Sequence, residues 1–498
     1  MDGFLKRFVK GMVSILISIF HKEGIFFLCV NYKHMRPCVV FIFRRDLRLD
    51  DNVSLKRAVE FAKERKCGVV LCFEFHDDQV RGDYFGNNAF QFMIESLEDL
   101  QKSTGGKVGF HHTAKDGVGV VEKLADRYDI KMVFSNKDYT PYATYRDSLL
   151  VGTCAELSIP CTLSEDYTLH PMNSVCPKGK AAYTRFTPYY NASRKLSVHK
   201  ATSWNDSDND LFMRTASLTS SLEKYKAPSI KTLSGGRTIA LEAMRKVDLK
   251  NYSKSRNIPI RNATSKMSAY LKFGCISIRE FYWHIVTHAD ASHEMVKQLY
   301  WKEFYANIAF TFPKVLKAMT PQSTRNQPFN SKELPWKSKG FERWCKGETG
   351  FPIVDAGMRE MNHTGFMHNR LRMIVASFLI KDLHIDWRMG ERYFAIKLTD
   401  YDPASNNGGW QWSAGTGTDA QPYHRIFNPW TQAERFDPKC EYIVRWIPEL
   451  ASVDVDDILT WDTSFRKHAE VDYPKPMVDH SVERKRSLAM VYKSVNKK

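Results

Sequence analysis

The stretch that decides the fold of the first third of the chain is Cys38–Phe43 (CVVFIF), a run of six apolar residues. Three more short apolar runs follow, at Val69–Phe75 (VVLCFEF), Val108–His111 (VGFH) and Met132–Ser135 (MVFS). Runs of this length, without regular alternation with polar residues, are typical of strands that are buried on both faces of a parallel sheet. The sequence therefore predicts four buried strands.

Between these runs, apolar residues recur at the spacing of one helix face. One such segment contains Phe90, Met93, Ile94, Leu97 and Leu100, and a second contains Val121, Leu124 and Tyr128. Strands that alternate with helices predict a parallel sheet covered by helices. We expect an α/β domain over residues 35–165.

The remainder of the chain has a different pattern. Residues 166–235 are rich in Ser, Thr, Asn and Lys, which is typical of a long surface connection. Over residues 236–498 the strand pattern disappears and helical stretches take its place. These stretches are Ile239–Arg245, Ser277–Thr287, Glu294–Ala309, Ile353–Met361 and Arg370–Lys381. The sequence therefore predicts an interdomain connector followed by an all-α domain.

The first 34 residues differ from the body of the chain. They contain the apolar run Met12–Phe20, which has Lys and Arg before it and His and Lys after it. The run is too short to span a bilayer. Two interpretations stay open for residues 1–34: a targeting segment, or an appendage that precedes a second start at Met35.

Composition limits the function. A length of 498 residues suits two or three domains, and 43% apolar and 26% charged residues are ordinary for a globular protein. The 73 Lys and Arg residues exceed the 56 Asp and Glu residues, and the resulting charge of +17 indicates a polyanionic partner, either nucleic acid or an anionic membrane surface. A protein that is basic without such a partner is the alternative. The 10 cysteines are scattered without a Cys-x-x-Cys pair, so we expect free thiols in a reducing compartment and no metal site.

The densest group of unusual residues is Asp400–Trp412 (DYDPASNNGGWQW). Its aspartates can hold ring N–H or ribose groups, its glycines permit close approach to a planar ligand, and its tryptophans can stack. A polar turn with two core tryptophans is the alternative. Upstream, Phe366–Met373 (FMHNRLRM) places Asn369 and Met373 on one helical face with two diverging arginines, so one arginine can face a carboxylate and the other a phosphate or solvent.

Several long segments together resemble the photolyase/cryptochrome family, over residues 36–495, with the greatest resemblance to microbial class I cyclobutane pyrimidine dimer photolyases. These segments are Phe43–Asn52 (FRRDLRLDDN), Tyr183–Pro188 (YTRFTP), Trp344–Tyr393, Asp400–Pro429 and Tyr473–His480 (YPKPMVDH). The resemblance implies that residues 35–165 form an antenna domain, that residues 166–235 connect the domains, and that residues 236–498 form the helical FAD-binding catalytic domain.

The resemblance implies one FAD per chain, reduced in the active state. The residues expected to hold it are Tyr252, Thr264, Ser265, Lys266, Met267, Ser268, Asn369, Arg372, Asp400, Asp402 and Asn406. Arg372 matches the partner of the Asp400 carboxylate, and hydroxyl and N–H groups at a helix N-terminus suit a pyrophosphate. Asn406 matches the residue that faces flavin N5, where plant cryptochromes have aspartate and insect cryptochromes have cysteine.

Further residues match the parts of the family that carry electrons and bind the lesion. Trp410, Trp387 and Trp336 match the tryptophan relay that reduces the excited oxidised flavin. Trp301, Met373 and Trp412 match the walls of an apolar pocket for a dimer flipped out of DNA. Arg256, Arg370 and Arg425 match positions near the phosphates, which position the duplex without reading its sequence.

Three departures from the family pattern bear on function. Gln298 stands where the family has a glutamate that contacts the dimer, and glutamine there is also found in (6-4) photolyases and animal cryptochromes. Met295 and Phe366 replace tryptophans beside the flavin. The Asn-Glu pair that contacts a folate antenna in some relatives falls on Tyr142-Ala143, so a second chromophore would be another flavin or a deazaflavin, or is absent.

The resemblance implies a light-driven DNA repair enzyme in which reduced FAD donates an electron that splits cyclobutane pyrimidine dimers. The partner is damaged DNA, without a membrane, and we expect a monomer in the nucleus or cytoplasm. Three alternatives stay open: a cryptochrome-like blue-light photoreceptor, a (6-4) photolyase, and a light-independent nucleic-acid-binding module.

Overall fold

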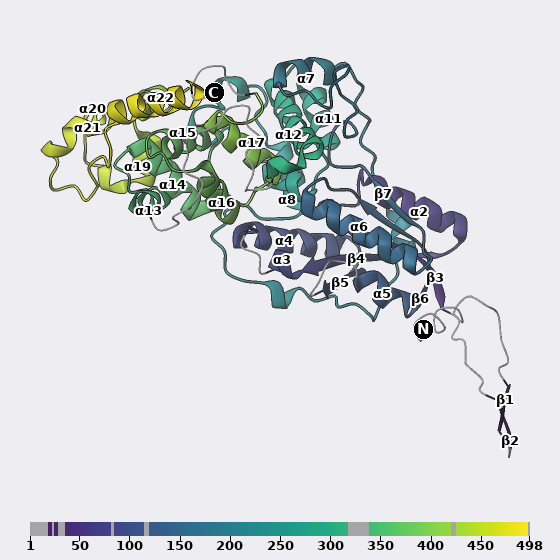
Figure 1. Ribbon diagram of the computed structural model, residues 1–498. Helices are drawn as coiled ribbons and strands as arrows, with labels where there is room; N and C mark the ends of the chain where they lie inside the picture. The colour runs from purple at the N-terminus through teal and green to yellow at the C-terminus, as the bar shows by residue number, and fades with distance from the viewer. Residues whose placement is uncertain are drawn as a thin grey trace.

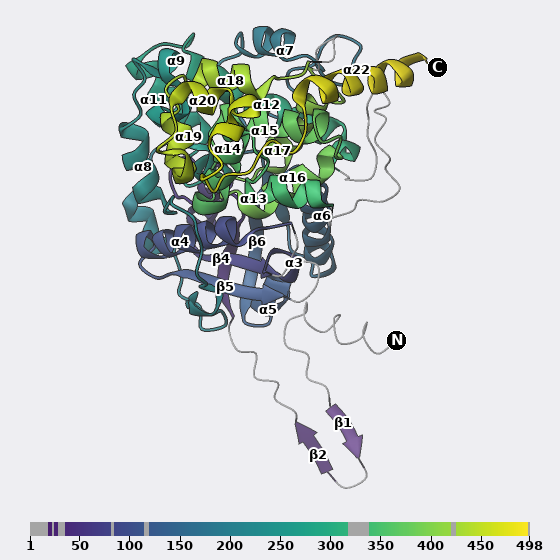
Figure 2. The same cartoon turned by 90° about the vertical axis from the view of Figure 1, so that its left-hand side faces the viewer.

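The computed structural model describes residues 35–80, 84–113, 119–316, 338–419 and 425–496, and the backbone of a hairpin formed by β1 (Ser18–His21) and β2 (Gly24–Phe27). The rest of residues 1–34, expected to be a targeting segment or an appendage, lies outside the described residues. Figure 1 and Figure 2 show an α/β domain formed by the first part of the chain and, above it, a domain built from helices.

The α/β domain is built on a parallel sheet with the strand order β5-β4-β3-β6-β7. The strands are β3 (Arg36–Phe43), β4 (Gly68–His76), β5 (Val108–Thr113), β6 (Tyr128–Asn136) and β7 (Cys161–Ser164). The four predicted strands are confirmed. The additional strand, β7, is short and lies at the edge of the sheet, paired with β6 alone.

Alternate residues of β3 face opposite sides of the sheet, and both sides are buried. The odd-numbered residues from Val39 to Phe43 belong to a core cluster that contains residues of α2 (Val53–Arg65) and α4 (Asn87–Ser103). The even-numbered residues from Cys38 to Ile42 belong to a cluster that contains residues of α5 (Gly119–Ala125) and α6 (Pro141–Glu156). Helices on both faces therefore explain why β3 is apolar throughout its centre. A short helix, α3 (Asp77–Val80), follows β4.

In the part of residues 236–496 that the structure describes, every regular element is helical, and the all-α prediction is confirmed. The α-helices after β7 are α7 (Phe186–Ser193), α8 (Arg237–Arg245), α9 (Tyr252–Ser255), α10 (Ser268–Phe273), α11 (Ile278–His288), α12 (Glu294–Thr311), α13 (Lys339–Lys346), α14 (Pro352–Thr364), α15 (Asn369–Lys381), α16 (Trp387–Lys397), α17 (Pro403–Ala414), α18 (Pro429–Phe436), α19 (Glu441–Trp446), α20 (Val455–Leu459), α21 (Trp461–Ser464) and α22 (His480–Asn496). Short 3-10 helices occur at Asp206–Leu211, Glu223–Tyr225, Pro259–Arg261, Pro313–Leu316, Pro448–Leu450 and Phe465–Lys467. None of the described helices combines the length and apolar character needed to cross a bilayer.

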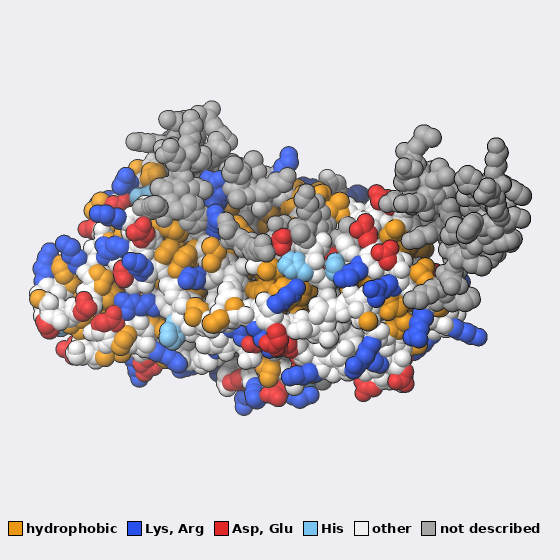
Figure 3. Space-filling view, turned by 90° about the horizontal axis from the view of Figure 1, so that it is seen from below, with side chains coloured by type: hydrophobic (Ala, Val, Ile, Leu, Met, Phe, Trp, Pro, Cys, Tyr) orange, Lys and Arg blue, Asp and Glu red, His pale blue; other side chains and the backbone are white. Residues whose placement is uncertain are grey.

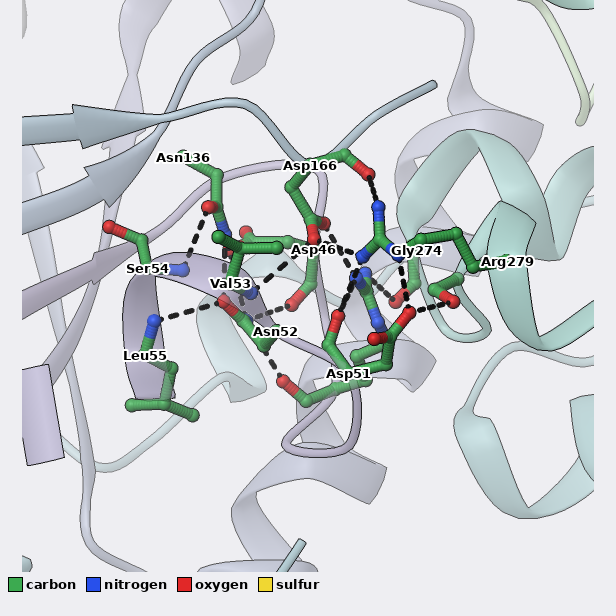
Figure 4. A network of polar contacts seen from close by, with 12 residues as sticks. Asp46, Asp51, Asn52, Val53, Ser54, Leu55, Asn136, Asp166, Gly274 and Arg279 are labelled. Carbon is green, nitrogen blue, oxygen red and sulfur yellow. Dashed lines mark hydrogen bonds and ion pairs between the residues drawn. The ribbon is translucent and has the colours of Figure 1, made fainter. Parts of the chain in front are cut away.

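A buried ionic network joins the two domains (Figure 4). Asp166, at the start of the connector, accepts hydrogen bonds from Arg48 of the α/β domain at 2.6 Å and from Arg279 of α11 at 2.7 Å. Arg279 also binds the carboxylate of Asp51 at 2.8 Å. Burial alone would raise the pKa of Asp166, but the two guanidinium groups outweigh it and the pKa is lowered. The loop that follows β3 is therefore anchored to the helical domain by paired charges.

Candidate active site

A cavity of about 650 Å³ lies among α10, α12, α15, α16 and α17, and its wall brings together most of the residues predicted from the sequence. From the predicted flavin set, the wall contains Tyr252, Ser265, Met267, Ser268, Asn369, Arg372, Asp400, Asp402 and Asn406. From the other predicted sets it contains Arg256, Gln298, Trp301, Met373, Trp410 and Trp412. Residues expected to contact the flavin and residues expected to contact the lesion therefore line the same cavity.

Other predicted residues are placed elsewhere. Thr264 and Lys266 adjoin wall residues in the chain but are not part of the wall, and Trp387 is buried at the start of α16. Arg370 binds the side-chain oxygen of Asn257 at 2.9 Å, and Arg425 is exposed. Trp336 lies outside the described residues.

The carboxylate of Asp400 is held by residues of two helices. Arg372 of α15 donates from Nη2 to Oδ1 at 3.0 Å and to Oδ2 at 2.9 Å. Ser268, at the start of α10, donates its hydroxyl to Oδ2 at 2.7 Å. The expected partnership of Arg372 and Asp400 is therefore present, and a charge-assisted bond fixes the carboxylate at the cavity wall.

Asp402 forms the N-cap of α17, where its side chain accepts a hydrogen bond from the Ser405 backbone N–H at 3.0 Å. Its other oxygen accepts bonds from Arg45 Nη2 and from the Tyr167 hydroxyl, each at 2.5 Å. Burial would raise the pKa of Asp402, but Arg45 and Lys302 outweigh it and the pKa is strongly lowered. Asp402 is therefore charged, and the α/β domain supplies part of the compensating charge.

Two lysines in the cavity wall were not predicted from the sequence as site residues. The ammonium nitrogens of Lys272 and Lys302 are buried and form no hydrogen bond with any described residue. Burial lowers the pKa of each lysine to about 7. The Lys302 ammonium lies 3.0 Å from the centroid of the Tyr167 ring and the Lys272 ammonium 4.3 Å from that of Phe273, so aromatic rings are their nearest partners. Because neither ammonium has a hydrogen-bond acceptor among the described residues, the wall favours an anionic occupant.

These residues fit FAD. The diphosphate of FAD is an anion that can pair with Lys272 and Lys302, and the buried hydroxyl of Thr264, which also lacks a hydrogen-bond partner among the described residues, is a free donor beside the wall. The carboxylates of Asp400 and Asp402 are fixed acceptors for ring N–H or ribose groups. Sequence reasoning missed the two lysines because a lysine in a helix is ordinarily interpreted as a surface residue.

Aromatic side chains line another part of the cavity. Trp301 of α12 stacks on Phe186 of α7 with 3.6 Å between ring centroids and 6° between the ring planes. Trp412 and Met373 lie in the same wall and are half-buried. Gln298, one helical turn before Trp301, donates from its amide to the Glu294 carbonyl at 3.3 Å. This part of the wall can receive a planar base.

Trp410 is buried on α17, with its ring centroid 5.0 Å from that of Phe394 and 6.2 Å from that of Trp344. Trp344 was not among the predicted relay residues. Because Trp336 lies outside the described residues, the order of the relay stays a prediction.

On the face seen in Figure 3, basic and acidic side chains are interspersed, and no continuous basic track crosses the residues described there. The excess charge of +17 is therefore not gathered on that face. The roles of Arg370 and Arg425 toward DNA stay predictions.

Comparisons with known proteins agree with this geometry. Residues 39–204 match the family model of DNA photolyase, and residues 295–493 match that of the FAD binding domain of DNA photolyase. The deoxyribodipyrimidine photo-lyase of Alkalihalophilus pseudofirmus is 38% identical over 482 residues, which cover 90% of this chain and 96% of the relative.

Two solved structures of photolyases are also similar to this chain along nearly its whole length. An archaeal photolyase from Sulfolobus tokodaii, described with two FAD molecules, is 34% identical with a TM-score of 0.76 and covers 92% of this chain and 99% of its own. A class III photolyase from Agrobacterium tumefaciens is 31% identical with a TM-score of 0.81 and covers 94% of this chain and all of its own. A parallel-sheet domain, a helical domain with a cavity suited to FAD, and likeness along nearly the whole chain lead to one conclusion: the chain belongs to the photolyase/cryptochrome family.

Proposed function

We propose that the protein is a light-driven DNA repair enzyme that acts on cyclobutane pyrimidine dimers. The observation that carries the proposal is the single cavity in which the Arg372–Asp400 pair and the buried lysines adjoin the Trp301–Phe186 stack. The relative that is 38% identical over 96% of its length is a deoxyribodipyrimidine photo-lyase, which supports the same reaction here. Bound FAD in its reduced, light-excited form supplies the electron that splits the dimer.

The protein contributes binding, orientation and electrostatics. Arg372 and Ser268 keep the Asp400 carboxylate in one position, where it can accept a hydrogen bond from a flavin ring or ribose group. Lys272 and Lys302 neutralise the diphosphate, and their burial strengthens the attraction because little water screens it. No side chain has to act as a nucleophile or a general base.

The aromatic part of the wall holds the lesion. Trp301 is kept in place by its stack on Phe186, and the half-buried Trp301 and Trp412 side chains offer apolar aromatic surface in the cavity wall to a flipped-out dimer. Flipping costs a few kcal/mol in an intact duplex and less at a damaged, poorly stacked site, which favours lesions. Gln298 can donate its amide to a thymine carbonyl at the same edge.

Within the family we favour the class I type, although a class III enzyme is also similar to this chain. The run from Asp400 to Pro429, which resembles class I enzymes, supports this choice, and Trp301, Met373, Asn406 and Trp412 support cyclobutane dimers as the substrate. Asn406 also favours repair over a cryptochrome-like photoreceptor, because asparagine is the photolyase residue at this position. We further propose that the enzyme acts as a monomer on damaged DNA in the nucleus or cytoplasm.

Light-dependent repair tests the proposal. Purified, photoreduced protein is incubated with an oligonucleotide that contains one cyclobutane thymine dimer, in light and in the dark. We expect restored thymines only in light and only with FAD bound. Equal restoration in the dark, or none in light with FAD bound, would contradict the proposed function.

A further inference from the structure

Asn406, the residue expected to face flavin N5, is held by Glu391, a residue that was not predicted from the sequence. Its amide nitrogen Nδ2 donates to the carboxylate oxygen Oε1 of Glu391 at 2.9 Å and to the Glu391 backbone carbonyl at 3.2 Å. Both bonds direct the amide nitrogen of Asn406 toward Glu391. The atom of Asn406 that is left for a group in the cavity is therefore the acceptor Oδ1.

Glu391 lies on α16 and is buried, with 3% of its surface exposed. Burial raises the pKa of this carboxyl group above its usual value, and the hydrogen bonds from Tyr84 and Asn406, which favour the charged form, offset part of that rise. The Tyr84 hydroxyl donates to Oε2, the oxygen that Asn406 does not use. Glu391 therefore accepts one side-chain bond on each oxygen, and a buried carboxylate needs such donors.

Tyr84 belongs to the other domain, in the segment just before α4, and is 39% exposed. Two residues later, at Gly86, the backbone passes very close to α16. A Cβ added to Gly86 would lie only 1.8 Å from the Ile396 carbonyl oxygen. Only a glycine permits this approach. The Tyr84 ring also lies 6.0 Å from the ring of Tyr401, measured between centroids. The bond from Tyr84 to Glu391 is thus fixed by the packing of the two domains.

We propose that Tyr84 is a positioning residue of the flavin site: it holds Glu391 as a carboxylate, and that carboxylate orients and polarises the Asn406 amide so that Oδ1 accepts the hydrogen bond of flavin N5–H. The inference rests on the proposed function only in requiring that FAD occupies the cavity with N5 beside Asn406. A negative charge behind the amide and an acceptor in front of N5 act in the same direction, since both favour a proton on N5. Through the bonds from Tyr84 to Glu391 and from Asn406 to Glu391, the α/β domain thereby favours the protonated form of flavin N5.

The test is the visible absorption of the FAD-loaded protein during illumination with a reductant, without DNA. The long-wavelength band that reports a proton on flavin N5 is compared among variants with equal FAD content. We expect Tyr84→Phe to lose part of the band and Glu391→Gln to lose more. The double variant should lose no more than Glu391→Gln alone, because Tyr84 acts through Glu391.

Tyr145→Phe is the matched control, since Tyr145 is a tyrosine of the same domain that is 55% exposed on α6. We expect this variant to keep the full band. A Tyr84→Phe band equal to that of the wild type, or a further loss when Tyr84→Phe is added to Glu391→Gln, would overturn the inference. Because the readout needs no lesion, a protein that shows this pattern but repairs nothing would contradict the proposed function and leave the inference standing.

Discussion

Arg45 of the α/β domain binds Asp402 of the helical domain, with Nη2 2.5 Å from Oδ2, although 357 residues separate them in the chain. The same guanidinium binds Asp138 at 3.2 Å and the Tyr167 hydroxyl at 2.7 Å. Asp402 in turn caps α17, the helix that carries Asn406. The α/β domain therefore supplies a counter-charge to the wall of the cavity in which we propose that FAD binds.

Arg45→Ala should destabilise the protein by about 3 kcal/mol, because it leaves the buried carboxylate of Asp402 without its main counter-charge. Urea unfolding of the FAD-free protein measures the change. Lys246→Ala is the matched control, since its pair with Glu242 is exposed at 3.8 Å and should contribute less than about 0.5 kcal/mol. Equal effects of the two substitutions would contradict the role given to Arg45.

Arg372→Ala should weaken FAD retention by about tenfold or more, because Asp400 loses the guanidinium that accounts for two of its hydrogen bonds. The dissociation constant is measured by titrating FAD-free protein with FAD. Arg372→Lys keeps the charge but loses the Nε–H that donates to the Met367 carbonyl, and should retain part of the affinity. Unchanged affinity in Arg372→Ala would show that the pair does not support the flavin.

Lys272 and Lys302 predict that both the stability of the FAD-free protein and the proton uptake on FAD binding depend on pH. The pKa of Lys272 and of Lys302 is about 7 in the folded, FAD-free protein, well below the usual value for lysine. Above about pH 7 the folded chain therefore binds fewer protons at these sites than the unfolded chain, so the two lysines make stability rise with pH in this window. Pairing with a diphosphate restores their protonated forms.

FAD binding at about pH 8.5 should therefore take up about one proton per lysine. Titration calorimetry in two buffers of different ionisation enthalpy measures the uptake. Lys272→Met and Lys302→Met should each remove about one proton from it. Binding without proton uptake in the wild type would contradict the assignment of these lysines to the diphosphate.

Trp410→Phe should greatly slow the photoreduction of bound oxidised FAD and leave repair by chemically reduced enzyme nearly intact, because the relay loads the flavin whereas repair uses a flavin already loaded. Transient absorption measures the first property and a repair assay the second. Trp283→Phe is a control, since Trp283 is half-buried on α11 and donates to the His199 carbonyl. Photoreduction of Trp410→Phe at the wild-type rate would show that Trp410 is not part of the relay.

DNA binding should weaken steeply with salt, with a log–log slope of about −0.9 for each phosphate neutralised. Arg425→Ala should reduce the magnitude of the slope by about one, because Arg425 is exposed. Arg370→Ala should change it less, since that guanidinium already binds Asn257. Fluorescence anisotropy at several salt concentrations measures the slopes, and an unaltered slope in Arg425→Ala would place the phosphate contacts elsewhere.

Much of the fold could be predicted from the sequence, because a strand such as β3 that is buried on both faces is apolar throughout its centre. β7 escaped detection since it has four residues and only its last is fully buried. Within the site, the Asp400–Trp412 segment could be recognised because its residues are contiguous. Arg45, Tyr84 and Glu391 could not, since their roles depend on contacts that form only when the two domains pack together.

The central claim is that the aromatic part of the cavity, next to the bound flavin, accepts a cyclobutane dimer, and side-by-side product analysis tests it most directly. Two oligonucleotides of the same sequence, one with a cyclobutane thymine dimer and one with a (6-4) product, are illuminated with photoreduced wild-type protein and with Gln298→Glu. We expect restored thymines from the cyclobutane dimer alone, and at least wild-type yield in Gln298→Glu, because a carboxyl group of similar volume restores the family contact. Efficient restoration of the (6-4) product by the wild type, or loss of dimer repair in Gln298→Glu, would contradict the account.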